Sequence, residues 1–293
     1  MANVVAVVVT YRPELSRLQN LLDATTPQVA HVVVVDNGNG ACFVPQNPRL
    51  HFLSMGDNLG IAKAQNEGIK RAKTLDATHV LLLDQDSVPA PDMVEELLKA
   101  LASLPDAACV GPRYLDDRRK SLSPFIRTQG LRRIHCACTY PDEIIEADQL
   151  IASGALVPMN AFERVGVMRE DFFIGCVDTE WGLRAKAQGR KSYGVCSAHM
   201  RHRLGEEPIS LFGKTFPSNT PLRNLYHSRN ALLLYREPWL PLKWKVIDGY
   251  HLLIKFVFYS LFAKPRFEHF KMMSLGFLDG IRGKGGKFQG LAH

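Results

Sequence analysis

Three short runs of apolar, mostly β-branched residues constrain the fold of this chain most. They cover residues 4–9 (VVAVVV), 32–35 (VVVV) and 80–83 (VLLL). Uninterrupted runs of this length are typical of parallel strands that are covered on both faces. Between and after them, apolar residues recur at spacings of three and four after Pro13, over residues 61–72 and after Pro91. The alternation predicts an α/β fold, with a wound, mostly parallel sheet and flanking helices.

Polar residues follow each of these predicted strands. The three clusters are Thr10-Tyr11, Asp36-Asn37-Gly38 and Asp84-Gln85-Asp86. Ligands of open α/β sheets bind beyond the carboxyl ends of the strands, so the clusters predict one site at that edge. Glycine fingerprints of dinucleotide-binding folds and the lysine motif of P-loop proteins are absent, which argues against those nucleotide sites.

Asp84 and Asp86 end the predicted third strand and repel each other unless a cation lies between them. A divalent ion that also binds phosphate oxygens would satisfy both carboxylates. The alternative is structural: Asp84 caps a turn and Asp86 begins the next helix.

Cysteine content and the chain start bear on the compartment. The six cysteines show no CxxC spacing, and the start MANVVAVVVTYRP has neither a basic region nor a cleavage site. We therefore expect reduced thiols, no signal peptide and a cytoplasmic protein.

The motifs VVVTYRP, DNG, GDNLGIAKAQNEGI, LLLDQDSVP, SGALVP and FFIGCVDTEWGLRAKAQG occur in this order. In order and spacing they resemble the family 2 inverting glycosyltransferases of the GT-A fold. The forms DQDS, DTEW, HRLGE and YHSRNALLLYR are most similar to bacterial rhamnosyltransferases that use dTDP-L-rhamnose. The resemblance extends from residue 4 to about residue 287.

This resemblance implies roles for individual residues. Asp84 and Asp86 would bind Mg²⁺ or Mn²⁺, with His202 as a further metal or diphosphate contact; zinc binding by His199 and His202, or a structural His202, are alternatives. Nucleotide-sugar contacts would come from Thr10, Tyr11, Asp36, Asn58, Gly60, Asp84, Gln85, Arg229 and Asn230. Arg229 and Asn230 could instead lie on a solvated helix face.

The catalytic base and the acceptor contacts follow from the same resemblance. Asp178 matches the position of the base, but Val177 replaces the acid usual before it, so Glu180 remains the alternative. Both acids also suit the first turn of a helix. Acceptor contacts are expected from Gly154, Ala155 and Trp181, although Trp181 could serve packing alone.

The implied activity is transfer of a sugar, L-rhamnose from dTDP-L-rhamnose, to a hydroxyl of a glycan acceptor in cell-surface, O-antigen-like polysaccharide biosynthesis. A growing glycan on a polyprenyl diphosphate is the implied acceptor, and no nucleic-acid partner is expected. Two alternatives are a phosphatase of the haloacid-dehalogenase type and a non-catalytic sugar-nucleotide-binding protein.

The chain is expected to divide at residue 240. Residues 1–240 would form the catalytic domain, with a donor half at 1–115, an acceptor half at 116–240 and a mobile loop at 116–140. Residues 241–293 carry nine Lys and Arg against three acids, much of the net charge of +7. Within this tail, Asp248, His251 and Lys255 form one polar stripe on an otherwise apolar helix. We expect a helix that lies on the inner membrane surface without spanning it; a core helix is the alternative.

Overall fold

The N-terminal half alternates strands and helices as predicted. The computed structural model describes residues 2–38, 47–116, 121–129, 132–148, 150–202, 206–211 and 214–290. The first elements are β1 (Val4–Thr10), α1 (Leu15–Thr25), η1 (Thr26–Gln28), β2 (His31–Asp36), β3 (Leu50–Ser54), α2 (Ile61–Lys73), β4 (His79–Asp84), β5 (Ser87–Pro89) and α3 (Met93–Ala102). All three predicted strands and the three helices between and after them are confirmed. The additional strand β3 (LHFLS) contains no β-branched residue, so the strand that ends in Asp84 is the fourth, not the third.

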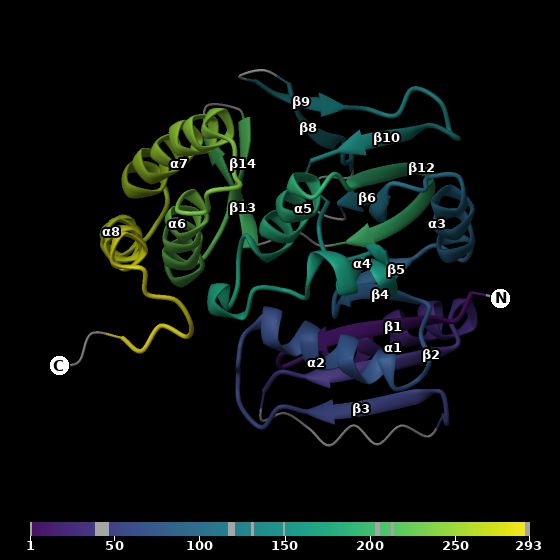
Figure 1. The fold of residues 1–293 in the computed structure, drawn as a ribbon. Helices are drawn as coiled ribbons and strands as arrows, with labels where there is room; N and C mark the ends of the chain where they lie inside the picture. Colours follow the sequence, from purple (N-terminus) through teal and green to yellow (C-terminus); the bar gives the residue numbers. More distant parts are fainter. Residues whose placement is uncertain are drawn as a thin grey trace.

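The following segment completes the sheet with shorter elements. They are β6 (Ala107–Asp116), β7 (Ser121–Leu122), β8 (Phe125–Gln129), β9 (Arg132–Cys136), β10 (Ile144–Ala147), β11 (Leu156–Pro158), α4 (Met159–Val165), η2 (Glu170–Phe172), α5 (Val177–Ala187), β12 (Lys191–His202), β13 (Glu206–Leu211) and β14 (Lys214–Ser218). The main sheet has the order β10-β12-β6-β11-β4-β1-β2-β3 (Figure 1). Pairs β1–β2, β1–β4, β2–β3 and β12–β6 are parallel, whereas β11 runs antiparallel between β4 and β6.

The register brings the predicted polar clusters to one edge of this sheet. Thr10 pairs with Asp36 across β1 and β2, and Val9 pairs with Asp84 across β1 and β4. Because β1, β2 and β4 are parallel neighbours, their carboxyl ends lie side by side. The predicted convergence is confirmed.

The sheet separates two hydrophobic cores. Successive residues of a strand face opposite sides. Val5 and Val7 accordingly pack with the buried residues of α2, α4 and α5, while Val4 and Val8 pack with those of α1 and α3. Coverage on both faces explains why the strands are apolar without interruption.

The segment at 116–140 is more regular than predicted. β7 pairs with β6, and β8 and β9 form an antiparallel hairpin that projects from the sheet (Figure 1). The described residues of this segment therefore form strands where a loop was expected; Arg118, Arg119 and Lys120 lie outside them. β9 has the sequence RRIHC, whose polar residues concealed the strand.

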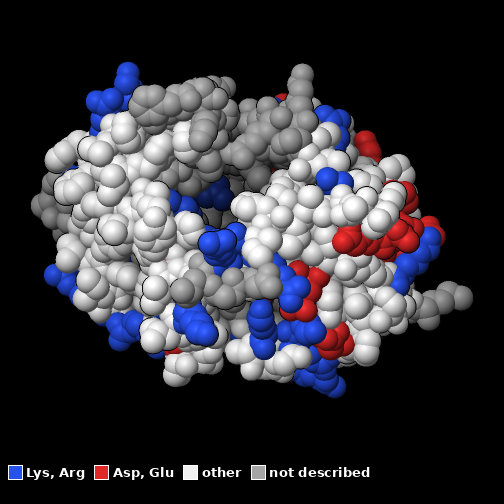
Figure 2. All heavy atoms as spheres, turned by 90° about the horizontal axis from the view of Figure 1, so that it is seen from above, with Lys and Arg blue, Asp and Glu red and all other residues white. Residues whose placement is uncertain are grey.

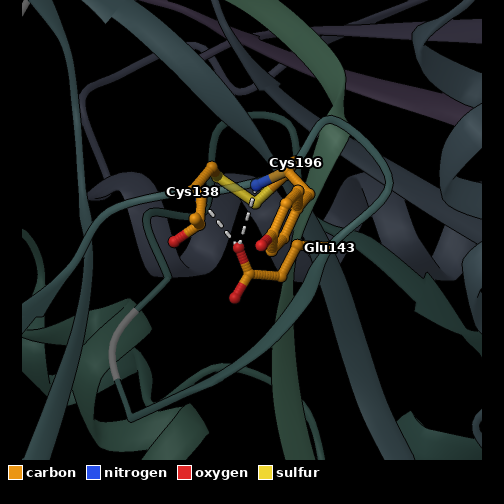
Figure 3. The surroundings of a disulfide bond; sticks show 5 residues. Cys138, Glu143 and Cys196 are labelled. Atoms are coloured by element: carbon orange, nitrogen blue, oxygen red, sulfur yellow. Dashed lines mark hydrogen bonds between the residues drawn. A yellow bond between two sulfur atoms is a disulfide. The ribbon is translucent and has the colours of Figure 1, made fainter.

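The expectation of reduced thiols throughout is also wrong. Cys138 and Cys196 form a disulfide that ties the segment after β9 to β12, across 58 residues of sequence. Glu143 supports this segment, because one oxygen of its carboxylate accepts hydrogen bonds from Thr139 N at 2.7 Å and Tyr140 N at 3.4 Å (Figure 3). Its carbonyl accepts another from Cys196 N at 3.0 Å. The pairing depends on the strand topology and not on local spacing, so the sequence pattern did not reveal it.

Three helices form a layer at one end of the sheet. They are α6 (Pro221–Tyr235), α7 (Leu242–Phe262) and α8 (Arg266–Arg282) (Figure 1). α8 approaches α6 closely at Gly276, where an added Cβ would lie 2.4 Å from the carbonyl oxygen of Leu225. The C-terminal region therefore packs tightly against the rest of the chain.

The polar stripe of α7 faces inward in part. Asp248 pairs with Arg133 of β9 and accepts a hydrogen bond from the hydroxyl of Tyr235 at 2.6 Å. The exposed side chains of this helix are largely apolar: Leu242, Val246, Tyr250, Leu253, Ile254, Val257, Leu261 and Phe262. The side of the molecule on which α7 lies is accordingly mostly uncharged in Figure 2. No helix in the described ranges is long and apolar enough to cross a membrane.

Candidate active site

The three predicted metal ligands come together at the edge of the sheet. Asp84 ends β4, Asp86 lies in the turn that follows, and His202 ends β12 opposite Ser87 of β5. One ligand atom from each lies within 4.8 Å of the others. Two carboxylates and an imidazole in this arrangement can hold a divalent cation. His199, the other half of the suggested zinc pair, is exposed and lies outside this group.

Two buried serines hold the metal-binding group in place. Ser153 Oγ accepts a hydrogen bond from Asp84 N at 3.0 Å and lies 2.6 Å from Ser87 Oγ. Ser87 Oγ lies 2.8 Å from His202 Nδ1. Partners of this kind fix the orientation of a ligating imidazole, so this network positions His202 for the cation.

The electrostatics of Asp84 favour a bound cation. Burial raises the pKa of this carboxyl; His202 opposes the rise, the carboxylates of Asp86 and Asp178 add to it, and Arg223 opposes it. A divalent cation would stabilise the ionised form of both neighbouring acids. The donor set and its charge therefore fit a metal site.

A cleft of about 240 Å³ adjoins this group. It is lined by Val9, Tyr11, Asn37, Asn58, Gly60, Ile61, Asp84, Gln85, Asp86, Phe173, Ile174 and Arg223. Tyr11 is 42% exposed, and its backbone N–H donates to Gln85 Oε1 at 2.7 Å. Gln85 Nε2 donates in turn to the Tyr11 carbonyl, so Gln85 joins the ends of β1 and β4.

Asp36 directly precedes Asn37, which lines this cleft. Asp36 is only 3% exposed, and neither of its carboxylate oxygens has a hydrogen-bond partner among the described residues. Thr10, beside it, directs its hydroxyl to the carbonyl of Val35. An unpaired buried carboxylate is costly, so Asp36 is suited to accept hydrogen bonds from a ligand.

Asn58 and Gly60 shape the wall of the cleft. Asn58 Oδ1 accepts hydrogen bonds from Gly60 N at 3.1 Å and from Asn37 Nδ2 at 3.2 Å. Gly60 has φ +92°, and an added Cβ would lie 2.7 Å from Phe173 O, the atom to which Ile61 N donates at 2.7 Å. Only glycine combines this backbone conformation with so close an approach.

Asp178 and Glu180 have different surroundings. Asp178 lies in the first turn of α5 and lines a second cleft with Tyr114, Pro124, Phe125, Ile126, Leu150 and Ser153. Burial raises the pKa of Asp178, although hydrogen bonds from backbone N–H groups, including Thr179 N at 2.8 Å, oppose the rise. Glu180 is 2% exposed and binds Arg184 through both oxygens, at 2.8 and 3.0 Å. Of these two acids of α5, only Asp178 lines a described cleft.

The expected acceptor residues lie mostly in the interior. Trp181 is 3% exposed, donates to the carbonyl of Gly166 at 2.8 Å and packs on Phe162. Gly154 and Ala155 are buried, and Gly154 N donates to Leu82 O at 2.7 Å. Trp181 thus packs in the core, and none of the three lines the cleft that Asp178 shares with Tyr114. Ala155 and Trp181 do border a small cavity of about 20 Å³ together with Asp178.

Arg229 and Asn230 are not solvated, and they do not line the cleft beside Asp84 and Asp86. They are 2% and 0% exposed and lie on α6. Their side chains donate to the backbone carbonyls of Asp171, Phe172, Ile174, Gly175 and Gly286. They therefore position the segment at 171–175, which contributes Phe173 and Ile174 to the cleft.

Three residues of the site were not singled out from the sequence. Arg223, in the first turn of α6, places a positive charge in the donor cleft. Asn37 belonged to a predicted polar cluster but was given no role of its own. Ser153 precedes the expected acceptor residues and instead supports Asp84. A basic residue after Thr220-Pro221 gave no local signal for a site.

Comparison with known sequences identifies related enzymes. The model of glycosyl transferase family 2 matches residues 6–141. The dTDP-rhamnosyl transferase RfbF of Shigella flexneri is 34% identical over 291 residues, 96% of this chain and 96% of that protein. An N-acetylglucosaminyl-diphospho-decaprenol L-rhamnosyltransferase of Mycobacterium tuberculosis is 27% identical over 242 residues, 71% of this chain and 78% of that protein.

Solved structures share the fold. GalNAc-T7 with UDP, GalNAc and Mn²⁺ has a TM-score of 0.58 and 12% identity, covering 86% of this chain and 54% of that chain, so this chain spans about half of that protein. The mannosyltransferase PcManGT of Pyrobaculum calidifontis, in complex with GDP-Man and Mn²⁺, has a TM-score of 0.55 and 15% identity. The match covers 96% of this chain and 86% of that chain. With the near full-length relative, these matches establish that this chain is a glycosyltransferase of family 2 with a GT-A-type fold.

Proposed function

We propose that the enzyme transfers L-rhamnose from dTDP-L-rhamnose, with inversion, to a hydroxyl of a lipid-linked glycan. The support for the donor is the 34% identical dTDP-rhamnosyl transferase. The observation that carries the proposal is a cleft lined by Asn37, Asp84 and Asp86, with the unpartnered, buried Asp36 directly before Asn37 and with His202 beside the two acids. In this proposal Asp36 offers an acceptor for a pyrimidine N–H, and the two acids with His202 offer a cation site for a diphosphate.

In this proposal the donor nucleotide lies along the first cleft. Asp36 accepts a hydrogen bond from the base, and Tyr11 lies beside it. Asp84, Asp86 and His202 would hold Mg²⁺ or Mn²⁺, which when bound would stabilise the negative charge that develops on the leaving diphosphate. Arg223 contributes positive charge in the same cleft.

Asp178 is proposed as the catalytic base. It takes the proton from the acceptor hydroxyl as the hydroxyl oxygen attacks the anomeric carbon, and the bond from that carbon to the diphosphate breaks. The raised pKa of Asp178 makes the carboxylate a better proton acceptor than an exposed aspartate. Glu180 is assigned to holding Arg184.

A panel of nucleotide sugars and divalent ions tests which donor and which ion the enzyme binds. Binding of dTDP-rhamnose, dTDP-glucose and UDP-hexoses is measured by thermal shift with Mg²⁺, Mn²⁺ or a chelator. We expect dTDP-rhamnose with a divalent ion to give the largest shift. A preference for a UDP-hexose would contradict the donor assignment while leaving the family membership intact.

We further propose that residues 1–240 are the catalytic unit and that residues 241–293 hold the enzyme at the cytoplasmic membrane face. The exposed apolar residues of α7 and the basic tail support this placement. An apolar face with cationic flanks binds anionic lipid reversibly. Lys287 forms an ion pair with Asp57 at 2.8 Å, which partly neutralises its charge.

Sedimentation with vesicles tests the membrane contact. We expect the parent to bind vesicles that contain anionic lipid and to be released by high salt, because salt screens exposed charges. Changing Lys264, Lys284 and Lys287 together to Glu should reduce binding. If the triple variant sediments with the vesicles as well as the parent does, the basic residues of the tail are not a membrane contact.

A further inference from the structure

Residues 285–288, which follow α8, form a strap beside the proposed donor cleft. Figure 1 shows the chain leaving α8 and passing below α6 before the C-terminus. Lys287 Nζ lies 2.8 Å from Asp57 Oδ2, and Phe288 N donates to the hydroxyl oxygen of Tyr226 at 2.9 Å. No residue of the strap lines the cleft itself, so the strap can act on it only through these neighbours.

The side chain of Lys287 reaches the loop that forms one wall of the cleft. Its partner Asp57 also accepts a hydrogen bond from Asn58 N, at 2.7 Å through the other carboxylate oxygen. Asn58 lines the cleft, and its side chain bonds to Asn37 and Gly60, which line it too. The side chains of the ion pair are 49% and 61% exposed, so the pair restrains this loop at the protein surface.

The rest of the strap contacts the segment that supplies Phe173 to the cleft. Gly286 N donates to Asp171 O at 2.6 Å. The ring of Phe173 stacks on that of Tyr226, with centroids 5.0 Å apart and planes 17° apart. Phe288 packs against the apolar cluster to which both rings belong. A second wall of the cleft is therefore also tied to the strap.

Phe173 requires support from its neighbours, because its backbone is strained. Its φ is +60°, in a region that residues other than glycine rarely adopt. Strained residues persist only where the surrounding contacts impose their conformation, and they gather at ligand sites. Ile61 N, at the start of α2, supplies one such contact by donating to Phe173 O at 2.7 Å. This bond joins the two walls directly, and the strap joins them a second time.

The contacts close a ring. From Phe173 the ring runs through Tyr226 and the strap to Asp57, and then along the chain to Ile61, which returns to Phe173. Each contact in a closed ring limits the movement of the others, so release of the strap should let both walls move. A cleft that is held in one shape before binding loses less conformational entropy when its ligand binds.

We propose that the strap positions both walls of the cleft for the donor nucleotide, with Lys287 and Phe288 as positioning residues. The inference rests on the proposed function, because that function places the nucleotide in this cleft. All the residues that line the cleft come from residues 1–240, and the strap adds their support from the C-terminal region. It should therefore govern affinity for the donor and leave the chemical step unchanged.

Exchanging the charges of the ion pair tests the contact with the first wall. The full chain is titrated calorimetrically with dTDP and Mg²⁺. Lys287→Glu alone, or Asp57→Lys alone, sets like charges side by side and should weaken dTDP binding about fivefold, the upper range for an exposed ion pair. The double variant restores the pair in reverse order and should bind dTDP within about twofold of the parent. Lys284→Glu, the same change just before the strap, is the matched control and should also stay within about twofold.

Three results of this titration would overturn the proposal. In the first, the double variant binds dTDP as weakly as the single variants do. In the second, Lys287→Glu binds dTDP as tightly as the control Lys284→Glu. In the third, Asp57→Lys alone strengthens dTDP binding, which would mean that a charge at this position contacts the nucleotide directly.

A substitution at Gly285 tests the contact with the second wall. An added Cβ would lie 2.8 Å from Asp171 Cβ and 2.9 Å from Asp171 O, so alanine must displace the strap from this segment. We expect Gly285→Ala to weaken dTDP binding about tenfold through the shift of Phe173. Lys284→Ala, at the preceding residue, should change it less than about twofold. Equal dTDP affinity of the two variants would overturn the role of the strap at this wall.

Transfer kinetics separate positioning from a general effect on folding. With dTDP-rhamnose, metal and saturating acceptor, Lys287→Glu and Gly285→Ala should raise KM for the donor and change kcat less than about twofold. A lower kcat with an unchanged donor KM would overturn the proposal, because loss of folded enzyme reduces the active fraction without altering KM.

A parallel titration with UDP separates this inference from the proposed function. A parent that prefers UDP to dTDP would refute the donor assignment alone, because the strap acts on the walls and predicts the same relative losses for either nucleotide. Absence of transfer by a parent that binds dTDP and shows these losses would refute the proposed activity alone. A parent that binds neither nucleotide would overturn both.

Discussion

Replacing Asp178 and Glu180 one at a time separates the two acids of α5. Removal of a general base typically slows a reaction 10² to 10⁴-fold, or about 3 to 5 kcal/mol in activation free energy. We expect Asp178→Asn to lower kcat by this amount. The substitution should not lower the melting temperature, because the raised pKa of Asp178 indicates that folding disfavours its charge.

Glu180→Gln should behave in the opposite way. Glu180 is buried against Arg184, and the neutral amide would keep one acceptor oxygen but set an NH2 group against the second guanidinium donor and remove the compensating charge. Loss of a charged hydrogen-bonded pair should cost about 1 to 3 kcal/mol of unfolding free energy. The melting temperature should then fall by roughly 2 to 4 °C for each kcal/mol, with kcat changed only a few-fold.

The assay combines transfer kinetics with thermal unfolding of each variant. In the parent, kcat/KM should fall with decreasing pH as Asp178 becomes protonated, and the midpoint should lie above the usual aspartate range near ~4, because burial raises this pKa. A Glu180→Gln enzyme that folds normally but lacks activity, together with an active Asp178→Asn enzyme, would refute the assignment.

Three further outcomes are expected. Asp86→Asn removes one of the three proposed metal ligands beside Asp84 and His202. It should abolish the metal-dependent thermal shift by dTDP-rhamnose and reduce transfer at least about 100-fold. Normal transfer by this variant in a chelator would contradict the metal role. Asp36→Asn should leave folding intact and weaken binding of dTDP about tenfold in a competition assay, and unchanged affinity would show that Asp36 does not contact the base. Cys196→Ser should lower the unfolding free energy by about 4 kcal/mol in chemical denaturation, because the disulfide to Cys138 closes a loop across 58 residues of sequence. An unchanged midpoint would mean that the two thiols are reduced in solution.

Sequence patterns located the site because its main residues lie at strand ends. Asp36 and Asp84 follow apolar runs whose parallel pairing fixes their position, so local pattern and sheet topology sufficed. His202 needed the family resemblance, since it lies opposite Ser87 through the pairing of β12 with β5, strands that are far apart in the sequence.

The roles that sequence could not assign depend on contacts between distant elements. Glu180 could be separated from Asp178 only by its bonds to Arg184, and Arg229 looked like a ligand contact until its partners proved to be backbone carbonyls. Asp248 belonged to a stripe expected to face water, yet its partner Arg133 comes from a hairpin that the sequence did not reveal. Periodicity shows which residues share a helix face but not what that face meets.

The contacts made by residues 286–288 have a consequence for biosynthesis. Gly286 N donates to Asp171 O and Phe288 N to the hydroxyl of Tyr226, while Arg229 joins Gly286 to the segment that supplies Phe173 to the donor cleft. Translation adds these residues after every other part of the cleft has been made, although domains begin to fold from the N-terminus. A nascent chain thus carries the proposed metal ligands and the proposed base long before the wall of the proposed donor cleft is held in place. Donor binding should therefore appear only after residues 286–288 have been synthesised.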